Sequence, residues 1–211
     1  MLRDSRLAQI QSVAGSVSRE TFDRIESFEA HFRRWNSAIN LVAPSTLPEL
    51  WDRHILDSAQ LVPHARNAKK WADLGSGGGF PGAIVAILLN GDCVVHLVES
   101  NQKKAAFLRT TLATLGISTA FVHPQRIEQA AARIGDVDIV SARALTALPD
   151  LLALSAPFMM RGARGLFHKG RDYRREVEES RDAWKFDLVE HPSLVDPTSI
   201  ILDVSGLRRT V

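Results

Sequence analysis

Residues 73–82 carry the clearest indication of chemistry in this chain, because an acid is followed by a turn made mostly of glycine. The segment reads Asp73-Leu74-Gly75-Ser76-Gly77-Gly78-Gly79-Phe80-Pro81-Gly82. A short apolar run before it predicts a strand, and the apolar run 83–89 after it predicts a helix. Glycines can take a positive φ and let backbone N–H groups approach a ligand closely. The segment therefore predicts a cofactor site, although such turns also occur without a ligand.

Two classes of cofactor fit this turn. Gly77-x-Gly79-x-x-Gly82 matches the fingerprint of dinucleotide-binding proteins, whereas Gly75-x-Gly77-x-Gly79 preceded by Asp73 resembles the first motif of S-adenosylmethionine-dependent methyltransferases. A carboxylate before the turn can pair with the ammonium group of S-adenosylmethionine, but it would repel an anionic pyrophosphate. Asp73 therefore favours the methyltransferase interpretation, and a dinucleotide-binding dehydrogenase remains the alternative.

Further polar side chains follow the other predicted strands. Glu99 and Ser100 end the next apolar run, about 20 residues past the glycines, where an acid can hold both ribose hydroxyls of an adenosine in either cofactor class. Arg126, Arg143 and Lys169 fall at or just after the ends of later strands. The carboxyl ends of parallel strands meet at one edge of a sheet, so we expect these residues to surround one site.

The whole chain of 211 residues has the composition of one globular domain with a modest appendage, with 45% hydrophobic and 24% charged residues. The single Cys93 excludes a disulfide framework and a cysteine-based zinc site, and we expect no bound metal. No apolar run approaches the length of a membrane span. We therefore expect a cytoplasmic protein without membrane contact, and we take it to be a monomer.

We divide the chain into a helical N-terminal extension, residues 1–66, and a Rossmann-like domain, residues 67–211, which together form one structural unit. Apolar residues recur at intervals of three and four between residues 18 and 39 and predict an amphipathic helix with a wide aromatic face. This face is expected to dock the helix on the rest of the protein.

A second helix is predicted to begin at a capping box, Thr46-x-x-Glu49, and to run to about residue 63. Arg53 lies four residues before Asp57 and His54 three, so each can meet Asp57 on one helix face. From the residues alone, we interpret this group as a surface ion pair with a satisfied histidine.

After the glycine turn, predicted strands and helices alternate. The strands are expected at 93–98, 119–123, 137–141 and 165–169, followed by 186–190 and 199–204. This alternation predicts an α/β fold with a doubly wound, mostly parallel seven-stranded sheet. The eight residues between the last two strands are too few for a parallel crossover, so these strands must pair antiparallel. An antiparallel last strand is similar to the class I S-adenosylmethionine-dependent methyltransferase fold and is absent from a plain dinucleotide fold.

The chain lacks the residues that two classes of methyl transfer need, which narrows the range of methyl acceptors. Cytosine C5 methylation needs a cysteine nucleophile, and Cys93 begins a buried strand. Amine methylation commonly uses an Asp/Asn-Pro-Pro-aromatic tetrapeptide after the fourth strand, where this chain has Ser141-Ala142-Arg143-Ala144. A guanine N7 needs neither device, because its lone pair is already nucleophilic and alignment can suffice. Arginine and lysine can also donate to guanine O6.

Several motifs along the chain occur in a specific combination. They are Asn36 through Leu41, Arg53 through Ser58, Asp73 through Gly82, Lys103, Arg126-x-Glu128, Arg143-Ala144 and Lys169-Gly170. Together they resemble the GidB/RsmG family of bacterial small-subunit ribosomal RNA methyltransferases, from about residue 30 to 205. The resemblance implies N7 methylation of one guanosine in the decoding region of 16S rRNA, by direct displacement without a general base. It implies S-adenosylmethionine as cofactor, and 16S rRNA or the small ribosomal subunit as partner.

The resemblance also implies roles for individual residues. For the cofactor it implies contacts with Gly75, Phe80, Ile127, Glu128 and Arg143. With the residues of the glycine turn and of the next strand end, the predicted cofactor site comprises Asp73, Gly75, Ser76, Gly77, Gly79, Phe80, Glu99, Ser100, Ile127, Glu128 and Arg143. Arg143 would lie beside the transferable methyl group, and His54 and Lys169 are the further candidates for catalysis. The RNA would contact Asn40, Arg53, Lys103 and Arg126. Members of the family often have serine directly before the arginine, whereas here Ala142 precedes Arg143, which leaves the role of Ser141 open. Asp57 is expected to stabilise its own helix.

Six basic side chains lie between residues 161 and 175 against one acid. Arg171 and Arg174 are expected to contact the RNA, because such clusters can bind a phosphate backbone. The same charges can instead pair with the glutamates that follow at helical spacing. Two alternatives to an rRNA enzyme stay open: a methyltransferase acting on a small molecule, and a non-catalytic RNA-binding module.

Overall fold

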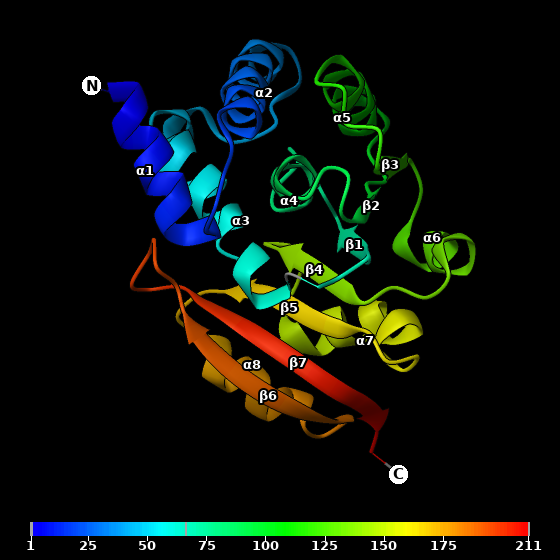
Figure 1. Ribbon diagram of the computed structural model, residues 1–211. Coiled ribbons are helices and arrows are strands. Elements are labelled where there is room, and N and C mark those ends of the chain that lie inside the picture. The colour runs from blue at the N-terminus through cyan, green and yellow to red at the C-terminus, as the bar shows by residue number, and fades with distance from the viewer. Residues whose placement is uncertain (1, 66, 211) are drawn as a thin grey trace.

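The computed structural model describes residues 2–65 and 67–210, and its centre is a seven-stranded sheet (Figure 1). The strands are β1 (Lys70–Leu74), β2 (Val94–Val98), β3 (Ala120–His123), β4 (Ile139–Arg143), β5 (Arg164–Lys169), β6 (Trp184–Pro192) and β7 (Ile200–Arg209). Their order is β3-β2-β1-β4-β5-β7-β6, with β7 antiparallel to both of its neighbours and the other pairs parallel. This confirms the predicted fold. The order reverses beside β1, and such a point leaves a crevice at the carboxyl ends of the strands.

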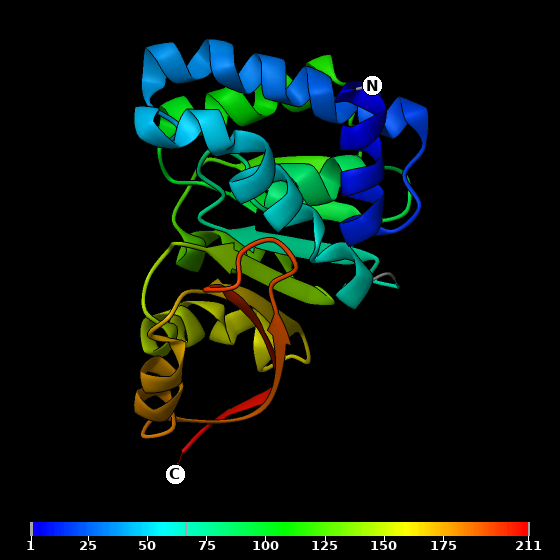
Figure 2. The ribbon, with the colours of Figure 1, turned by 90° about the vertical axis from the view of Figure 1, so that its left-hand side faces the viewer.

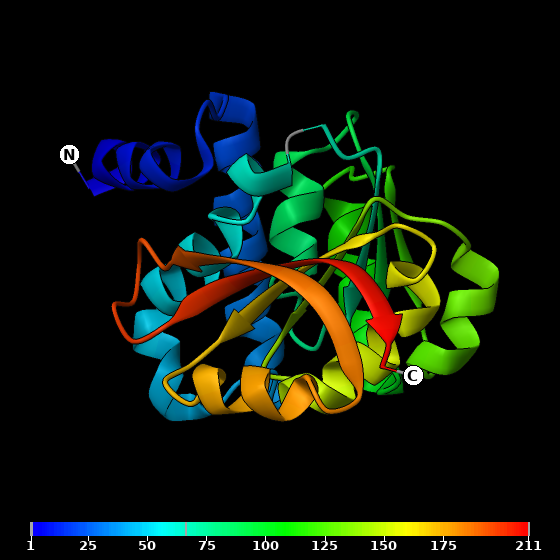
Figure 3. The same ribbon diagram turned by 90° about the horizontal axis from the view of Figure 1, so that it is seen from below.

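Helices cover both faces of the sheet, and the β6–β7 hairpin forms one of its edges (Figure 3). The helices along the sheet are α4 (Gly82–Leu88), α5 (Gln102–Thr114), α6 (Ile127–Ile134), α7 (Leu148–Met159) and α8 (Tyr173–Ser180). Neighbouring residues of β1 belong to different apolar clusters, Trp71 to the one with α4 and α5 and Ala72 to the one with α6 and α7. This is the pattern of a parallel strand buried on both faces. Among the described residues, no helix combines the length and apolar character needed to cross a membrane.

The N-terminal helices pack on the α4 and α5 side of the sheet (Figure 2). Helix α2 (Arg19–Ile39) confirms the predicted amphipathic helix, whereas α1 (Leu2–Ala14) lacks such regular apolar spacing and is found only in the structure. Phe28 and Phe32 of α2 lie 5.8 and 5.2 Å from the ring of Phe80 in the glycine turn, centroid to centroid. The aromatic face therefore fixes α2 over the turn. The division into an extension and a core domain stays a prediction.

The prediction of one continuous α-helix from Thr46 to about residue 63 is wrong. The chain instead forms a 3₁₀-helix η1 (Pro44–Glu49), a π-helix η2 (Trp51–Leu56), a single α-turn α3 (Asp57–Ala59) and a second 3₁₀-helix η3 (Val62–Ala65). The hydroxyl of Thr46 donates to the Ala43 carbonyl at 2.8 Å instead of forming a capping box. Pro48 lies inside η1 and has no N–H for an α-helical hydrogen bond.

The polar side chains of this segment have other partners than expected. Arg53 pairs with Glu49, four residues before it, at 2.9 Å, whereas Asp57 pairs with Arg143 on β4 at 3.0 Å. The expected pairing of Arg53 and His54 with Asp57 on one helix face is therefore wrong.

We expect Phe32→Ala to lower the free energy of unfolding by about 3–5 kcal/mol, because Phe32 is fully buried among aromatic rings and its removal leaves a cavity. Phe121→Ala is the matched control, since Phe121 is 50% exposed on the edge strand β3 and should cost about 1 kcal/mol or less. Urea unfolding of both variants measures the difference. Equal losses would contradict the docking role of α2.

Candidate functional site

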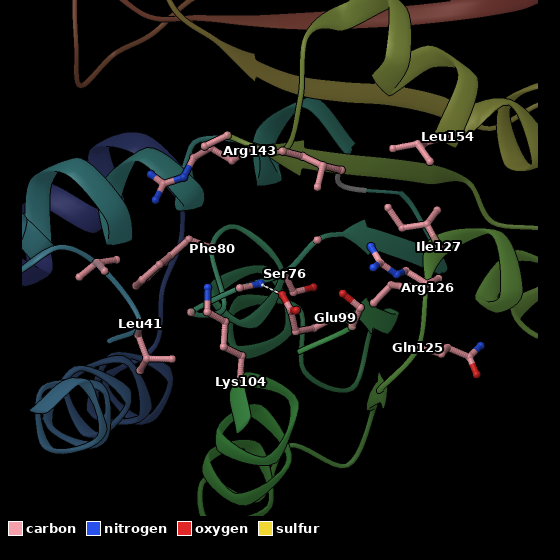
Figure 4. Close-up of a pocket in the computed structure, with 18 of the residues that line it drawn as sticks. Leu41, Ser76, Phe80, Glu99, Lys104, Gln125, Arg126, Ile127, Arg143 and Leu154 are labelled. Carbon is pink, nitrogen blue, oxygen red and sulfur yellow. Dashed lines mark hydrogen bonds between the residues drawn. The ribbon is translucent and has the colours of Figure 1, made fainter. Parts of the chain in front are cut away.

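A cavity of about 510 Å³ lies beside the glycine turn at the carboxyl ends of β1, β2 and β4, and we call it the turn cavity (Figure 4). Most of the predicted cofactor residues line it, namely Gly75, Ser76, Gly77, Phe80, Glu99, Ser100, Ile127, Glu128 and Arg143. Figure 4 shows Phe80 and Arg143 toward one end of the cavity and Arg126 and Ile127 toward the other. The structure thus brings together residues from positions 75 to 143 of the sequence.

The glycines of the turn have two different tasks. Gly75 and Gly77 have φ angles of 68° and 54°, a region that other residues rarely adopt. A Cβ at Gly75 would also lie 2.6 Å from Leu145 Cδ1, which lines the same cavity. Gly79 is not among the lining residues, contrary to expectation. A Cβ there would lie 3.1 Å from Phe28, so Gly79 allows the turn to pack closely against α2.

Asp73 lies beneath the turn and not in the cavity. It is fully buried, and its Oδ1 accepts from the Ser141 hydroxyl at 2.7 Å while its Oδ2 accepts from Gly82 N at 3.1 Å. Ser141 in turn accepts from the indole N–H of Trp71 at 2.8 Å. Burial raises the pKa of Asp73 to about 6 against the opposing effect of these hydrogen bonds. The expected direct ion pair of Asp73 with a cofactor ammonium is therefore corrected: Asp73 holds the turn in shape, and Ser141 holds Asp73.

Glu99 does face the turn cavity, from the tip of β2. Its Oε2 accepts from Gly77 N at 2.8 Å and its Oε1 from Asn101 N at 2.6 Å. A carboxylate has about four lone-pair positions, so each oxygen keeps capacity for a ligand hydroxyl. The acid thus ties the turn to β2 and offers acceptors to the cavity.

A second cavity, of about 550 Å³, adjoins the first, and we call it the hairpin cavity because the turn between β6 and β7 forms part of its wall. The two cavities share the lining residues His54, Arg143, Ala144 and Leu145. The two cavities are therefore direct neighbours along these residues. Ala144 has a φ of 51°, and such strain in a residue other than glycine is often found at functional sites.

Arg143 is the central side chain of the shared wall. Its Nη1 donates to Asp57 Oδ2 at 3.0 Å and to the Arg53 carbonyl at 2.7 Å, and its Nη2 donates to His54 Nδ1. A guanidinium has five N–H donors, so these three contacts fix it and leave donors for a ligand. Asp57 was expected to stabilise its own helix, but it anchors an arginine of the sheet.

His54 is a neutral hydrogen-bond donor in this arrangement. Its ring stacks on Phe80 with 5.1 Å between centroids, and burial together with the charge of Arg143 lowers its pKa to about 4. Because Nδ1 accepts from Arg143, the proton lies on Nε2. Nε2 is buried and has no hydrogen-bond partner among the described residues. Other atoms of His54 line both cavities, but this unused donor is enclosed by protein atoms, and His54 acts on the site through its contact with Arg143.

Lys169 lines the hairpin cavity, but its ammonium is already engaged. Nζ donates to the Thr146 carbonyl at 2.7 Å and pairs with Glu176 at 2.7 Å, and Glu176 also accepts from Leu148 N at 2.7 Å. These contacts hold the segment that follows Arg143. The structure thus gives Lys169 a positioning role, and the catalytic role expected of it stays a prediction.

Comparison with protein families gives a match over residues 22–199 to the GidB family, described as rRNA small subunit methyltransferase G. The chain belongs to this family. Proteins called ribosomal RNA small subunit methyltransferase G from Chelativorans sp. (strain BNC1) and Brucella canis are 57% and 52% identical to it, over 97% and 99% of this chain and 98% and 99% of theirs. Among solved structures, an O-methyltransferase from Bacillus cereus in complex with SAH has a TM-score of 0.60 at 14% identity, over 97% of this chain and all of that one. At that identity it shows the fold alone.

The residues expected to contact RNA lie at different distances from the two cavities of this GidB-family protein. Arg126 lines the turn cavity and Arg53 the hairpin cavity. The others lie outside both cavities and are exposed: Asn40 at the end of α2, Lys103 in the first turn of α5, and Arg171 and Arg174 around the start of α8. Their contacts with RNA stay a prediction.

Sequence reasoning missed Lys104 and Gln125, which line the turn cavity. Asn101 caps α5 by accepting from the backbone N–H groups of Lys103 and Lys104, which brings the side chain of Lys104 toward the glycine turn (Figure 4). The predicted start of this helix could have indicated Lys104, but the family motif contains Lys103 instead.

The buried Asp73 predicts a pH dependence of stability. Its folded pKa of about 6 lies above the unfolded value, so the folded state binds the extra proton between about pH 4 and 6. This contribution to stability is present at acidic pH and is lost as pH rises through 6. Lowering the pH from 7.5 to 5 should therefore favour the wild type over Asp73→Asn by about 1 kcal/mol. Urea unfolding of both proteins at both pH values measures it, and an offset that stays constant between the two pH values would contradict it.

Proposed function

We propose that this protein transfers a methyl group from S-adenosylmethionine to N7 of a guanosine in the decoding region of 16S rRNA. Its full-length relatives bear the name of a small-subunit rRNA methyltransferase. The observation that carries the proposal is the wall shared by two adjoining cavities, in which Arg143 is fixed beside a neutral His54. One cavity suits the methyl donor and the other suits the base.

The turn cavity fits S-adenosylmethionine. Its volume of about 510 Å³ lies within the usual range of small-molecule sites. The glycine backbone admits a close ligand, Glu99 offers acceptors for the ribose hydroxyls, and Ile127 offers an apolar side chain for the adenine. Lys104 can pair with the cofactor carboxylate, while the ammonium no longer has Asp73 as a direct partner. When bound, the cofactor supplies an electrophilic methyl group on a sulfonium.

The shared wall has donors and no poised general base, which suits N7 of guanine. The Nδ1 lone pair of His54 is occupied by Arg143, and its Nε2 carries the proton. N7 attacks with a lone pair in the ring plane and loses no proton, so none has to be accepted. Arg143 can donate to O6, the neighbour of N7, and so align the base, while His54 holds Arg143 in position. The N7 lone pair would form the new C–N bond as the methyl–sulfur bond breaks, so the positive charge passes from the sulfonium to the guanine ring and no proton has to be relayed.

An RNA substrate is favoured over a small molecule by the basic residues outside the cavities. Lys103, Arg171 and Arg174 are exposed and extend the positive surface beyond what a small ligand could contact. Contacts of this kind bind phosphates and release counterions, so the apparent affinity should fall steeply with salt. A small-molecule enzyme should be insensitive to neutralising Arg171 and Arg174.

Incubation of the protein with methyl-labelled S-adenosylmethionine and small ribosomal subunits or 16S rRNA tests the proposed function. We expect label in 7-methylguanosine at one nucleotide of the decoding region. Absence of label despite calorimetric binding of the cofactor would refute the rRNA substrate. Absence of cofactor binding would instead favour a non-catalytic RNA-binding module.

Arg143→Ala should lower kcat by about 100-fold or more while changing the Kd for S-adenosylmethionine only a few-fold, because the side chain aligns the base at the shared wall. Arg143→Lys tests geometry at constant charge and should also be impaired, since lysine lacks the planar fork. Arg208→Ala is the control, because Arg208 is exposed near the end of β7, at the end of the sheet away from the carboxyl ends of the parallel strands. Parallel losses of kcat and cofactor affinity would make Arg143 a plain binding residue.

A further inference from the structure

The turn between β6 and β7 forms the outer wall of the hairpin cavity. It covers residues 193–199, and Val195, Asp196 and Ser199 line the cavity. In the sequence this segment is merely a proline-containing connection of the antiparallel hairpin. The structure places it against the N-terminal helices, far from it in sequence (Figure 2).

This turn is held in one shape by hydrogen bonds. Gln60, which is buried, donates to the Ser193 hydroxyl at 3.0 Å and accepts from Leu194 N at 2.9 Å. Asp196 accepts from Thr198 N at 2.8 Å, and this contact holds the pKa of Asp196 below its usual value. The cavity therefore has an ionised, preorganised carboxylate on the wall formed by the hairpin.

His168 helps to shape the same cavity but offers it no accessible acceptor. Nε2 of His168 lies 2.9 Å from the Asp57 carbonyl, which can only accept, so the proton is on Nε2. Its Nδ1 has no partner in the described part of the chain and is enclosed by protein atoms, so a ligand in the cavity does not reach it. Asp196 therefore supplies the acceptor on the wall formed by the hairpin.

The walls of the hairpin cavity thus differ in polarity. The wall shared with the turn cavity carries the donors of Arg143, and the wall formed by the hairpin carries the acceptor Asp196, with the exposed Arg53 near it. Guanine has the matching polarity, with acceptors N7 and O6 on one edge and the donors N1–H and N2–H₂ elsewhere. Adenine presents an amino group beside N7 and an unprotonated N1. Its amino donor would face the donors of Arg143, and its N1 acceptor would face the Asp196 carboxylate.

We infer that Asp196 is a specificity-determining residue, whose carboxylate accepts from N1–H and N2–H₂ of the target guanine. The inference rests on the proposed function. Recognition of the base also explains why this position is acidic. Without that role, a carboxylate near an RNA backbone would only be repelled by the phosphates. Thr198 and Ser199 occupy part of the acceptor capacity of Asp196, and about four lone-pair positions leave room for the base.

The test compares guanosine with inosine at the methylated nucleotide, in small subunits reconstituted with 16S rRNA. Inosine lacks the N2 amino group but keeps N1–H, O6 and N7. The wild type should prefer guanosine by about 10- to 100-fold in kcat/KM, the effect of one hydrogen bond to a charged group. Asp196→Asn should reduce this preference to about threefold or less, with an unchanged Kd for S-adenosylmethionine. Asp182→Asn, exposed and remote from the cavity, should keep the full preference.

The ratio of the two substrates separates recognition from structure. If Asp196 only shaped its own turn, Asp196→Asn would slow both substrates equally and the preference would stay, which would overturn the inference. A wild type that methylates both substrates equally would also overturn it, while leaving the proposed function intact. A wild type that methylates neither would refute the proposed function itself.

Discussion

The ion pair between Arg143 and Asp57 connects the two halves of the site. Arg143 ends a central strand of the sheet, and Asp57 follows the π-helix of the N-terminal region. Their side chains are only 16% and 11% exposed, so both charges are largely withdrawn from water. Removing one partner of such a pair costs about 3–5 kcal/mol, because the other charge is left uncompensated. The N-terminal helices are therefore a part of the site and not simply an attachment to it.

The position of His54 depends on the same interaction. The π-helical turn brings His54 over Phe80 and within hydrogen-bonding reach of Arg143. Phe80 in turn is fixed by the aromatic side chains of α2. One chain of contacts thus runs from the apolar core of the N-terminal helices through the glycine turn to the wall between the cavities. A base and a cofactor that touch where the two cavities adjoin would be aligned by parts of the molecule that pack rigidly.

The sequence was sufficient for the sheet because its information is local there. Buried parallel strands read as apolar runs, and the short connection before β7 excludes a parallel crossover. The sequence was insufficient between residues 44 and 65, where the packing of Trp51 and Ile55 in the core competes with helix propensity. Predictions of the site residues also succeeded where the information was local. The place of Glu99 at a strand end was enough to predict that it lines the cavity. The burial of Asp73 could not be predicted in this way, because its partner Ser141 lies 68 residues away in the sequence.

The distribution of buried polar groups indicates which of these features serve folding alone. Asp57, Asp73 and His168 are buried next to extensive apolar clusters, where apolar residues of similar size would stabilise the fold as well or better. Asp73 has its hydrogen bonds satisfied within the protein, which is consistent with a purely positioning task. His168 and His54 each keep a buried nitrogen without a partner in the described residues, and both line the hairpin cavity. His96, Thr111, Gln125 and Ser155 also have buried atoms without a partner in the described residues and lie outside the hairpin cavity, so it is the contacts of Arg143 and Asp57, more than a missing partner, that distinguish the site.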